Sequence, residues 1–178
     1  KTSALSGLYP PQVWDCFSEI LAIPRPSKKE EKIIAWVLDF AAKQKLSAKT
    51  DAAGNILISK PATPGKESKP VVVLQSHLDM VCEKNSDVTF DFERDAIVPH
   101  VRDGWVTANG TTLGADNGIG MAAQLALLAA NDIPHGPIEC LFTVDEETGL
   151  TGAHALLPGF LTGKTLINIE AKNFNIPL

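Results

Sequence analysis

The fold is decided by the stretch Val71-Val-Val-Leu-Gln-Ser-His-Leu-Asp-Met80. Residues 71–75 form a short, mostly β-branched apolar run, which is typical of a strand buried on both faces of a sheet. The run ends at His77 and Asp79, polar residues that a buried strand does not carry without partners. Because they are two residues apart, both side chains leave the same face of an extended backbone. A histidine beside a carboxylate suits a metal ligand or a general base, since either role needs the ring in one tautomer; the alternative is a surface histidine with an ordinary loop aspartate.

Helical and extended patterns alternate on both sides of this stretch. Apolar residues at helical spacing predict helices over residues 14–21, 33–44, 121–130 and 152–157. Further strands are predicted over residues 46–50, 55–59, 104–108, 138–144 and 165–169, with a polar loop over 82–102. Ser27 and Glu30 are predicted to form an S-x-x-E capping box at the start of the second helix. The alternation predicts an α/β fold with a mostly parallel, mixed sheet flanked by helices.

The composition is that of a globular protein with one core. The 178 residues are 44% hydrophobic and 21% charged, which suffices for one domain. A formal net charge of −5 and the lack of a basic run argue against nucleic acid or an anionic membrane as partner. Three cysteines far apart in the sequence favour a reducing compartment over a disulfide framework. No apolar leader precedes Pro10, and the longest apolar stretch, residues 119–130, is too short to cross a bilayer, so a cytoplasmic protein is predicted.

Acidic and imidazole side chains follow several of the predicted strands. They are His77, Asp79, Glu146, Glu147 and Glu170, and Asp116 joins them at the start of a helix. The carboxyl ends of the strands line the ligand crevice in α/β sheets, so these groups can meet in one place. Several unneutralised carboxylates would repel one another there, whereas a pair of divalent cations would make their closeness favourable. One histidine with several carboxylates suits zinc, with manganese or cobalt as substitutes.

Two interpretations, a role at a metal centre and an ordinary structural role, are open for Asp116 and for the Glu146-Glu147 pair. Asp116 could bridge two metal ions, or it could be an ordinary helix cap. Neighbouring side chains diverge, so one glutamate could bind metal while the other accepts a proton from a metal-activated water; a solvated loop is the alternative. Gly118 and Gly120 form a G-x-G element, but neither G-x-G-x-x-G nor G-x-x-x-x-G-K-[ST] occurs, so a nucleotide site has little support.

Three motifs follow one another in the chain: His77-Leu-Asp79, Gly114-Ala-Asp-Asn-Gly118 and Glu146-Glu-Thr-Gly149. Their order resembles the co-catalytic di-zinc peptidases of the aminoacylase and carboxypeptidase type. The longer sequences around these motifs, together with His135-Gly-Pro137, resemble the bacterial aminoacyl-histidine dipeptidases (Xaa-His dipeptidase, peptidase D). The resemblance runs from about residue 8 to residue 168.

The resemblance implies a role for each of these residues. His77 would bind one of two zinc ions, and Asp79 would orient its ring. Asp116 would bridge both ions, Glu147 would bind one of them, and Glu146 would be the general base and proton shuttle. The family places an aspartate as ligand to the other zinc where this chain has Glu170. Glutamate is one methylene longer, so ligation by this residue is expected with an altered geometry.

The resemblance also implies a function. It is hydrolysis of dipeptides, preferably Xaa-His and including the β-alanyl-histidine type, by a metal-bridging hydroxide with a glutamate as general base. A small peptide is the expected substrate. A sheet that stops before its last strands leaves an open edge and an apolar face, so pairing with a second copy, as a homodimer, or with a partner protein is also expected. Two alternatives stay open: a related di-zinc aminopeptidase or deacylase with another substrate, and a non-enzymatic remnant that binds metal or a partner protein.

The family pattern continues well beyond the length of this chain. Residues 1–170 are expected to be the N-terminal part of the catalytic domain, and residues 171–178 a tail unlike the family continuation. The lid or dimerisation domain is expected to be absent, as is the C-terminal catalytic segment that supplies one more histidine ligand. The chain alone is therefore expected to be weakly active or inactive.

Overall fold

The central strand predicted from the sequence, β3 (Val72–His77), lies inside a mixed sheet. The computed structural model describes residues 4–170, so the predicted tail over 171–178 lies outside the described residues. Within residues 4–170 the sheet has five strands in the order β1-β2-β6-β3-β7. The other strands are β1 (Ser47–Thr50), β2 (Ile56–Lys60), β6 (Ile138–Thr143) and β7 (Thr165–Asn168). β3 runs parallel to β6 and β7, whereas β2 runs antiparallel to β1 and β6, which confirms the predicted α/β fold with a mixed sheet.

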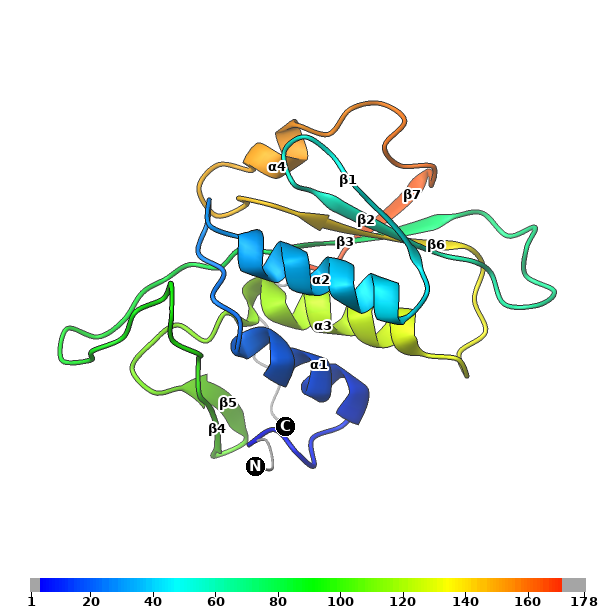
Figure 1. Ribbon diagram of the computed structural model, residues 1–178. Helices are drawn as coiled ribbons and strands as arrows, with labels where there is room; N and C mark the ends of the chain where they lie inside the picture. The colour runs from blue at the N-terminus through cyan, green and yellow to red at the C-terminus, as the bar shows by residue number, and fades with distance from the viewer. Residues whose placement is uncertain (1–3, 171–178) are drawn as a thin grey trace.

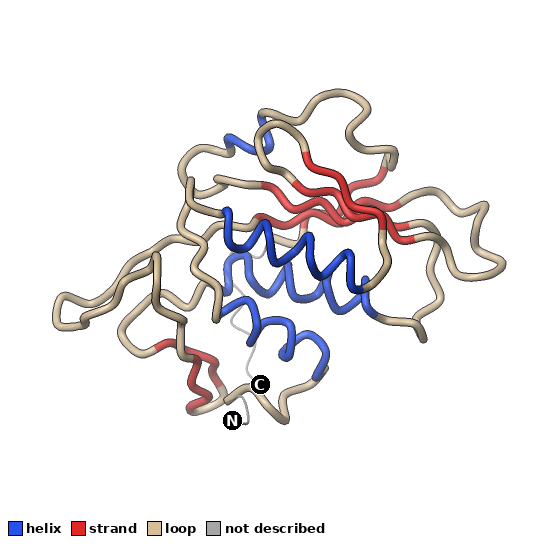
Figure 2. The backbone as a smooth tube through the Cα atoms, viewed as in Figure 1, coloured by secondary structure: helices blue, strands red, loops and turns tan. Residues whose placement is uncertain are grey.

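Helices α1 (Pro11–Leu21), α2 (Glu31–Lys43) and α3 (Ala115–Ala129) lie together on one face of this sheet, as Figures 1 and 2 show. The core between helices and sheet includes Phe17, Ile33, Met121 and Phe142, which are fully buried. Each of these four comes from a different element, so the three helices and the sheet share one core. None of the helices in the described part of the chain has the length and apolar content of a membrane span.

The opposite face of the sheet is covered by the short helix α4 (Thr151–His154) and the loop that follows it (Figure 1). The apolar residues buried or packed on this face are Leu57, Val73, Leu141, Leu156, Phe160 and Leu161. Glu139 of β6, only 5% exposed, accepts hydrogen bonds from the Thr162 hydroxyl (2.7 Å) and from the backbone N–H groups of Thr162 (2.9 Å) and Gly163 (3.1 Å). One buried carboxylate therefore holds the loop against the sheet.

A separate hairpin lies outside the main sheet, where β4 (Pro99–Arg102) pairs antiparallel with β5 (Trp105–Ala108) (Figure 1). The strand predicted over residues 104–108 is confirmed. Its partner lies in the segment interpreted as a polar loop, so that interpretation is wrong for residues 99–102. Three of the four residues of β4 are exposed, and such a strand carries no apolar run that the sequence could reveal.

The predicted capping box at the start of α2 is also wrong. Glu30 is the residue before the first helical turn, but no side chain caps this helix. Instead, the Ser27 hydroxyl donates to Asp79 Oδ2 (2.6 Å), and Glu30 Oε1 accepts from the backbone N–H of Asp145 (2.9 Å). Both side chains thus bind the segments that follow β3 and β6, where the predicted site residues lie.

Candidate metal centre

His77 ends β3 with its ring held at both nitrogens. The side chain is 1% exposed. Nδ1 lies 3.1 Å from the backbone oxygen and 3.2 Å from Oδ1 of Asp79, and Nε2 lies 3.0 Å from Oδ1 of Asp116. Burial acts to lower the pKa of His77, but Asp79 and Asp116 outweigh burial and raise this pKa above its usual value. With Nδ1–H directed at Asp79, Nε2 is the nitrogen left to face a ligand, which is the arrangement of a metal-binding histidine.

Asp116 reaches Nε2 because the backbone before it turns sharply. Gly114 precedes α3 in the left-handed conformation (φ 71°), and Asp116 itself is not helical (φ −82°, ψ 113°). A Cβ atom on Gly114 would lie 2.6 Å from Nη2 of Arg25 and 2.7 Å from Sδ of Met80, so the site has room for glycine alone. The Asp116–Asn117 peptide bond is cis. With the turn at Gly114, the start of α3 presents the Asp116 carboxylate to His77 at the end of β3.

Asp79 joins the histidine to the loop that follows β6. Its carboxylate accepts hydrogen bonds from the backbone N–H groups of Glu146 (3.0 Å) and Glu147 (3.1 Å), as well as from Ser27 and His77. Burial acts to raise the pKa of Asp79, but these donors outweigh it and hold the pKa well below its usual range. Asp79 is therefore an ionised anchor that fixes the positions of His77 and of both glutamates.

The predicted ligands converge on His77. Among the described residues, two groups of three side chains share this histidine, one with Asp116 and Glu147 and the other with Glu146 and Glu170. In each group the candidate ligand atoms all lie within 4.8 Å of one another. Glu146 Oε2 is 4.0 Å from His77 Nε2. All six residues singled out in the sequence thus gather at the carboxyl ends of β3, β6 and β7 and the start of α3; their individual roles stay predictions.

The buried cation Arg25 lies close to this cluster but donates to backbone carbonyls and not to its carboxylates. Within residues 4–170, no lysine or arginine forms an ion pair with Asp116, Glu146 or Glu147. Burial raises the pKa of both glutamates; the neighbouring carboxylates raise it further, while His77 opposes the rise. One imidazole nitrogen with several carboxylate oxygens is a donor set that zinc accepts. The residues present therefore fit a divalent cation.

Three residues support the cluster but were not assigned to it from the sequence, where Ser27 and Glu30 were interpreted as a helix cap. Arg25 is buried and donates to backbone carbonyls beside the site, and Ser27 binds Asp79. Glu30 binds the backbone of Asp145, whose carboxylate accepts from two threonine hydroxyls. The available signal was a charged residue between two prolines, in Ile23-Pro-Arg25-Pro26, directly before Ser27.

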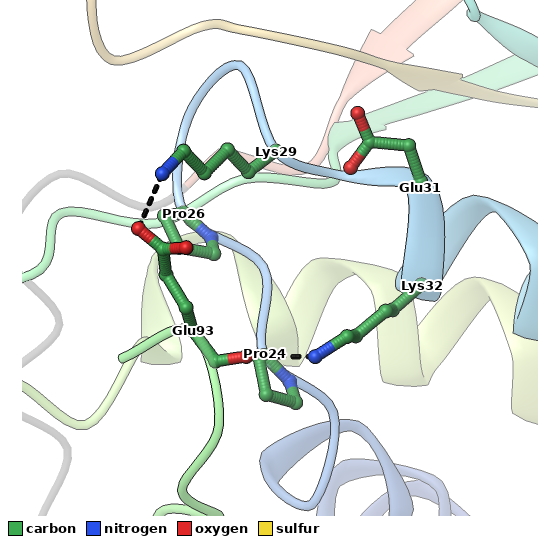
Figure 3. Close-up of a pocket in the computed structure, with 6 residues that line it drawn as sticks. All are labelled: Pro24, Pro26, Lys29, Glu31, Lys32 and Glu93. Atoms are coloured by element: carbon green, nitrogen blue, oxygen red, sulfur yellow. Dashed lines mark hydrogen bonds and ion pairs between the residues drawn. The ribbon is translucent and has the colours of Figure 1, made fainter. Parts of the chain in front are cut away.

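A cavity of about 290 Å³ lies away from the cluster. It is lined by Pro24, Pro26, Lys29, Glu31, Lys32 and Glu93. Figure 3 shows both lysines reaching Glu93: Lys29 pairs with the carboxylate, and Lys32 Nζ donates to the backbone oxygen (2.7 Å). None of the six clustered residues lines this cavity, so the candidate site is the cluster and not the cavity.

Comparison with known proteins gives one family and several relatives. Residues 73–174 match the model of "Peptidase family M20/M25/M40". The chain is 48% identical over 170 residues to the cytosol non-specific dipeptidase of Escherichia coli strain K12, a match that covers 96% of this chain and 35% of the relative.

Solved structures that are similar to this chain are also those of peptidases. An aminoacylhistidine dipeptidase from Vibrio alginolyticus superposes with a TM-score of 0.93 at 50% identity, over 96% of this chain and 35% of that one. The aminopeptidase PepT from Bacillus cereus superposes with a TM-score of 0.77 at 26% identity, over 91% of this chain and 43% of that one. The chain spans about a third of the length of the Escherichia coli and Vibrio relatives.

Proposed function

The chain belongs to the peptidase family M20/M25/M40, and on that premise we propose that it carries most of the two-metal centre of a dipeptidase. The observation that carries the proposal is the position of His77 Nε2, on which carboxylates from α3 and from the ends of β6 and β7 converge. The named relatives are dipeptidases and a peptidase, which supports hydrolysis as the reaction class. Because the chain spans about a third of the two dipeptidases, the activity of the whole protein is part of the proposal.

The proposed ligands divide between two ions. His77 and Glu170 would hold one ion, Glu147 would hold the other, and Asp116 would contribute a ligand to both. Glu170 takes the place where the family resemblance leads us to expect an aspartate. Its backbone N–H donates to the side chain of Asn168 (2.6 Å), and its side chain lies within the group formed by His77 and Glu146. The longer side chain therefore still reaches the cluster, which supports it as a ligand.

The proposed reaction is hydrolysis of a peptide bond. When bound, the two cations supply Lewis acids that polarise the scissile carbonyl and lower the pKa of a water. Glu146 lies beside the ligand cluster, 4.0 Å from His77 Nε2, where its carboxylate can accept the proton of that water and pass it to the leaving amine. Asp79 binds both the His77 ring and the backbone of Glu146, so base and ligand keep fixed relative positions.

For the substrate we propose Xaa-His dipeptides, the β-alanyl-histidine type included, and for the metal zinc. The Vibrio relative is named an aminoacylhistidine dipeptidase and the Escherichia coli relative a non-specific dipeptidase, which favours a preference for C-terminal histidine over a strict requirement. The Escherichia coli relative is named a cytosol dipeptidase, which supports a cytoplasmic location. Residues 1–170 are proposed as the N-terminal part of the catalytic domain. A homodimer stays a prediction.

The test compares the metal-free chain with the zinc-loaded chain on four substrates: β-alanyl-histidine, glycyl-histidine, a tripeptide and an N-acyl amino acid. We expect weak zinc-dependent cleavage of the two histidine dipeptides in preference to the others. Glu146→Gln should abolish this cleavage and leave the zinc content nearly unchanged. The matched control is Glu67→Gln, in the exposed loop before β3, which should leave both cleavage and zinc content as they are.

Each other result excludes one part of the proposal. Full cleavage by Glu146→Gln would remove the assignment of the base. Faster cleavage of the tripeptide or of the N-acyl amino acid would favour the related aminopeptidase or deacylase. Zinc binding without any cleavage would exclude hydrolysis by this chain alone, as expected of the metal-binding remnant.

A further inference from the structure

Arg25 connects the two segments that carry the proposed ligands. It lies between α1 and α2, and its side chain is 1% exposed. Nη1 donates to the backbone oxygens of Leu78 (3.0 Å) and Asp79 (2.8 Å), directly after β3. Nη2 donates to the backbone oxygen of Gly114, two residues before Asp116. One guanidinium group therefore spans from the end of β3 to the start of α3.

The guanidinium group is packed so closely that its position determines the spacing of the two segments. Cβ atoms built on Gly114 and Gly118 would lie 2.6 Å and 2.9 Å from Nη2, so the first turn of α3 rests directly on this nitrogen. The backbone of Arg25 is fixed from the same side, because its oxygen accepts the N–H of Met80 (3.2 Å). A planar group with donors in a fixed fork holds two acceptors at a set separation, which the flexible ammonium of lysine does not.

The positive charge of Arg25 is buried, which is unusual for an arginine whose hydrogen bonds go to backbone carbonyls. In the described part of the chain its hydrogen bonds go to carbonyl oxygens and not to a carboxylate. Burial lowers its pKa to about 10, so the group stays cationic at neutral pH, and the nearby Asp79, Asp116 and Glu147 act to raise the pKa. A buried cation without a direct ion pair is costly, and here it faces the anionic ligand cluster.

We propose that Arg25 is a positioning residue of the metal centre: it sets the spacing between the His77–Asp79 segment and Asp116, so that ligands from β3 and α3 meet at one place. The inference rests on the proposed function, since it concerns the same centre. It predicts that a change at Arg25 lowers metal affinity and alters the coordination geometry, although the side chain touches no metal ligand atom.

The test uses the full 178-residue chain as Arg25→Met and Arg25→Lys, with Arg94→Met, an exposed arginine, as matched control. Zinc affinity is measured by competition with a chromophoric chelator, and the visible absorption of the cobalt(II)-loaded chain reports the coordination geometry. We expect Arg25→Met to bind zinc ~10–100-fold more weakly, the usual effect of losing a group that orients ligands. Its cobalt spectrum should change, Arg25→Lys should fall between it and the unmodified chain, and Arg94→Met should match the unmodified chain.

The outcomes separate this inference from the proposed function. Arg25 has no positioning role if both Arg25 variants bind zinc as tightly as the unmodified chain and Arg94→Met do. Their cobalt spectra would then also be unchanged. If the unmodified chain itself binds no zinc, the proposed function and this inference fall together. If Arg25→Met does not fold, Arg25→Lys decides: weaker binding with an altered spectrum supports the role, and unchanged binding overturns it.

Discussion

The two ends of β6 carry buried or half-buried glutamates in opposite situations. At the start of the strand, Glu139 accepts hydrogen bonds from Thr162 and Gly163, all of them neutral donors of one loop. After its end, Glu146 and Glu147 face other carboxylates around His77. Burial acts to raise the pKa of all three, but the donors around Glu139 outweigh it, so this pKa is lowered whereas those of Glu146 and Glu147 are raised.

The difference separates a carboxylate that protein donors satisfy from carboxylates that are suited to bind a cation. A carboxylate whose oxygens are satisfied by protein donors is stable as an anion without help. Carboxylates that face one another have more acceptors than donors, and a bound divalent cation would supply positive charge between them. Changes at the start of β6 should therefore affect folding, and changes beyond its end should affect metal binding.

The largest effect is expected for His77→Ala. At a free zinc concentration of ~100 times Kd, the unmodified chain should gain about 2.7 kcal/mol in free energy of unfolding. The variant should gain none, because the ligand shared by both groups of side chains is gone. Urea unfolding with and without zinc measures the gain, and His100→Ala, exposed on β4, is the control. Equal stabilisation of His77→Ala by zinc would place the metal elsewhere.

Asp79→Asn should weaken zinc binding less than the loss of His77 does, by ~10–100-fold. The variant has one acceptor oxygen where the carboxylate has two, and its amide would face donors such as the backbone N–H groups of Glu146 and Glu147. The His77 ring would also lose its charged partner. Competition titration measures the affinity, and Asp87→Asn, on an exposed loop, is the control. Unchanged affinity would show that Asp79 does not order the centre.

Glu139→Gln should cost ~1–3 kcal/mol in free energy of unfolding, because the charged acceptor of three donor groups becomes neutral. Zinc affinity should stay that of the unmodified chain. Denaturant unfolding in a chelating buffer, together with a zinc titration, measures both quantities. A fall in zinc affinity as large as that of Asp79→Asn would contradict the separation of the two ends of β6.

The smallest effect is a dependence on pH. The pKa of Glu139 is lower in the folded chain than in the unfolded chain, so its stabilisation is complete above the unfolded value of about 4.3. This stabilisation is lost as the pH falls through the folded value. The difference in unfolding free energy between the unmodified chain and Glu139→Gln should therefore be constant from neutral pH to ~5 and shrink below ~4. A difference that grows on acidification would reverse the sign of the shift.

The convergence of the site could be predicted because it follows from strand order and composition. Polar residues after an apolar run mark a strand exit, and parallel strands bring their exits to one edge. His77, Glu146 and Glu170 were identifiable for this reason, and they lie together at the ends of β3, β6 and β7.

The supporting residues could not be predicted, because their partners are far away in the sequence. Ser27 and Glu30 match a local helix-capping pattern, yet they bind Asp79 and the backbone of Asp145, 52 and 115 residues later. The same limit applies to Arg25, whose acceptors lie in two segments that only the folded chain brings together. A short sequence pattern indicates which local contacts a side chain can make. It does not indicate which groups from distant parts of the chain bind that side chain instead.

The most direct test is anomalous X-ray scattering at the zinc edge from crystals of the zinc-loaded chain. We predict a peak at ~2.0–2.2 Å from His77 Nε2 and from carboxylate oxygens of Asp116, at the carboxyl end of β3. A peak elsewhere on the molecule, or no peak at saturating zinc, would contradict the proposal that these carboxylates bind a divalent cation.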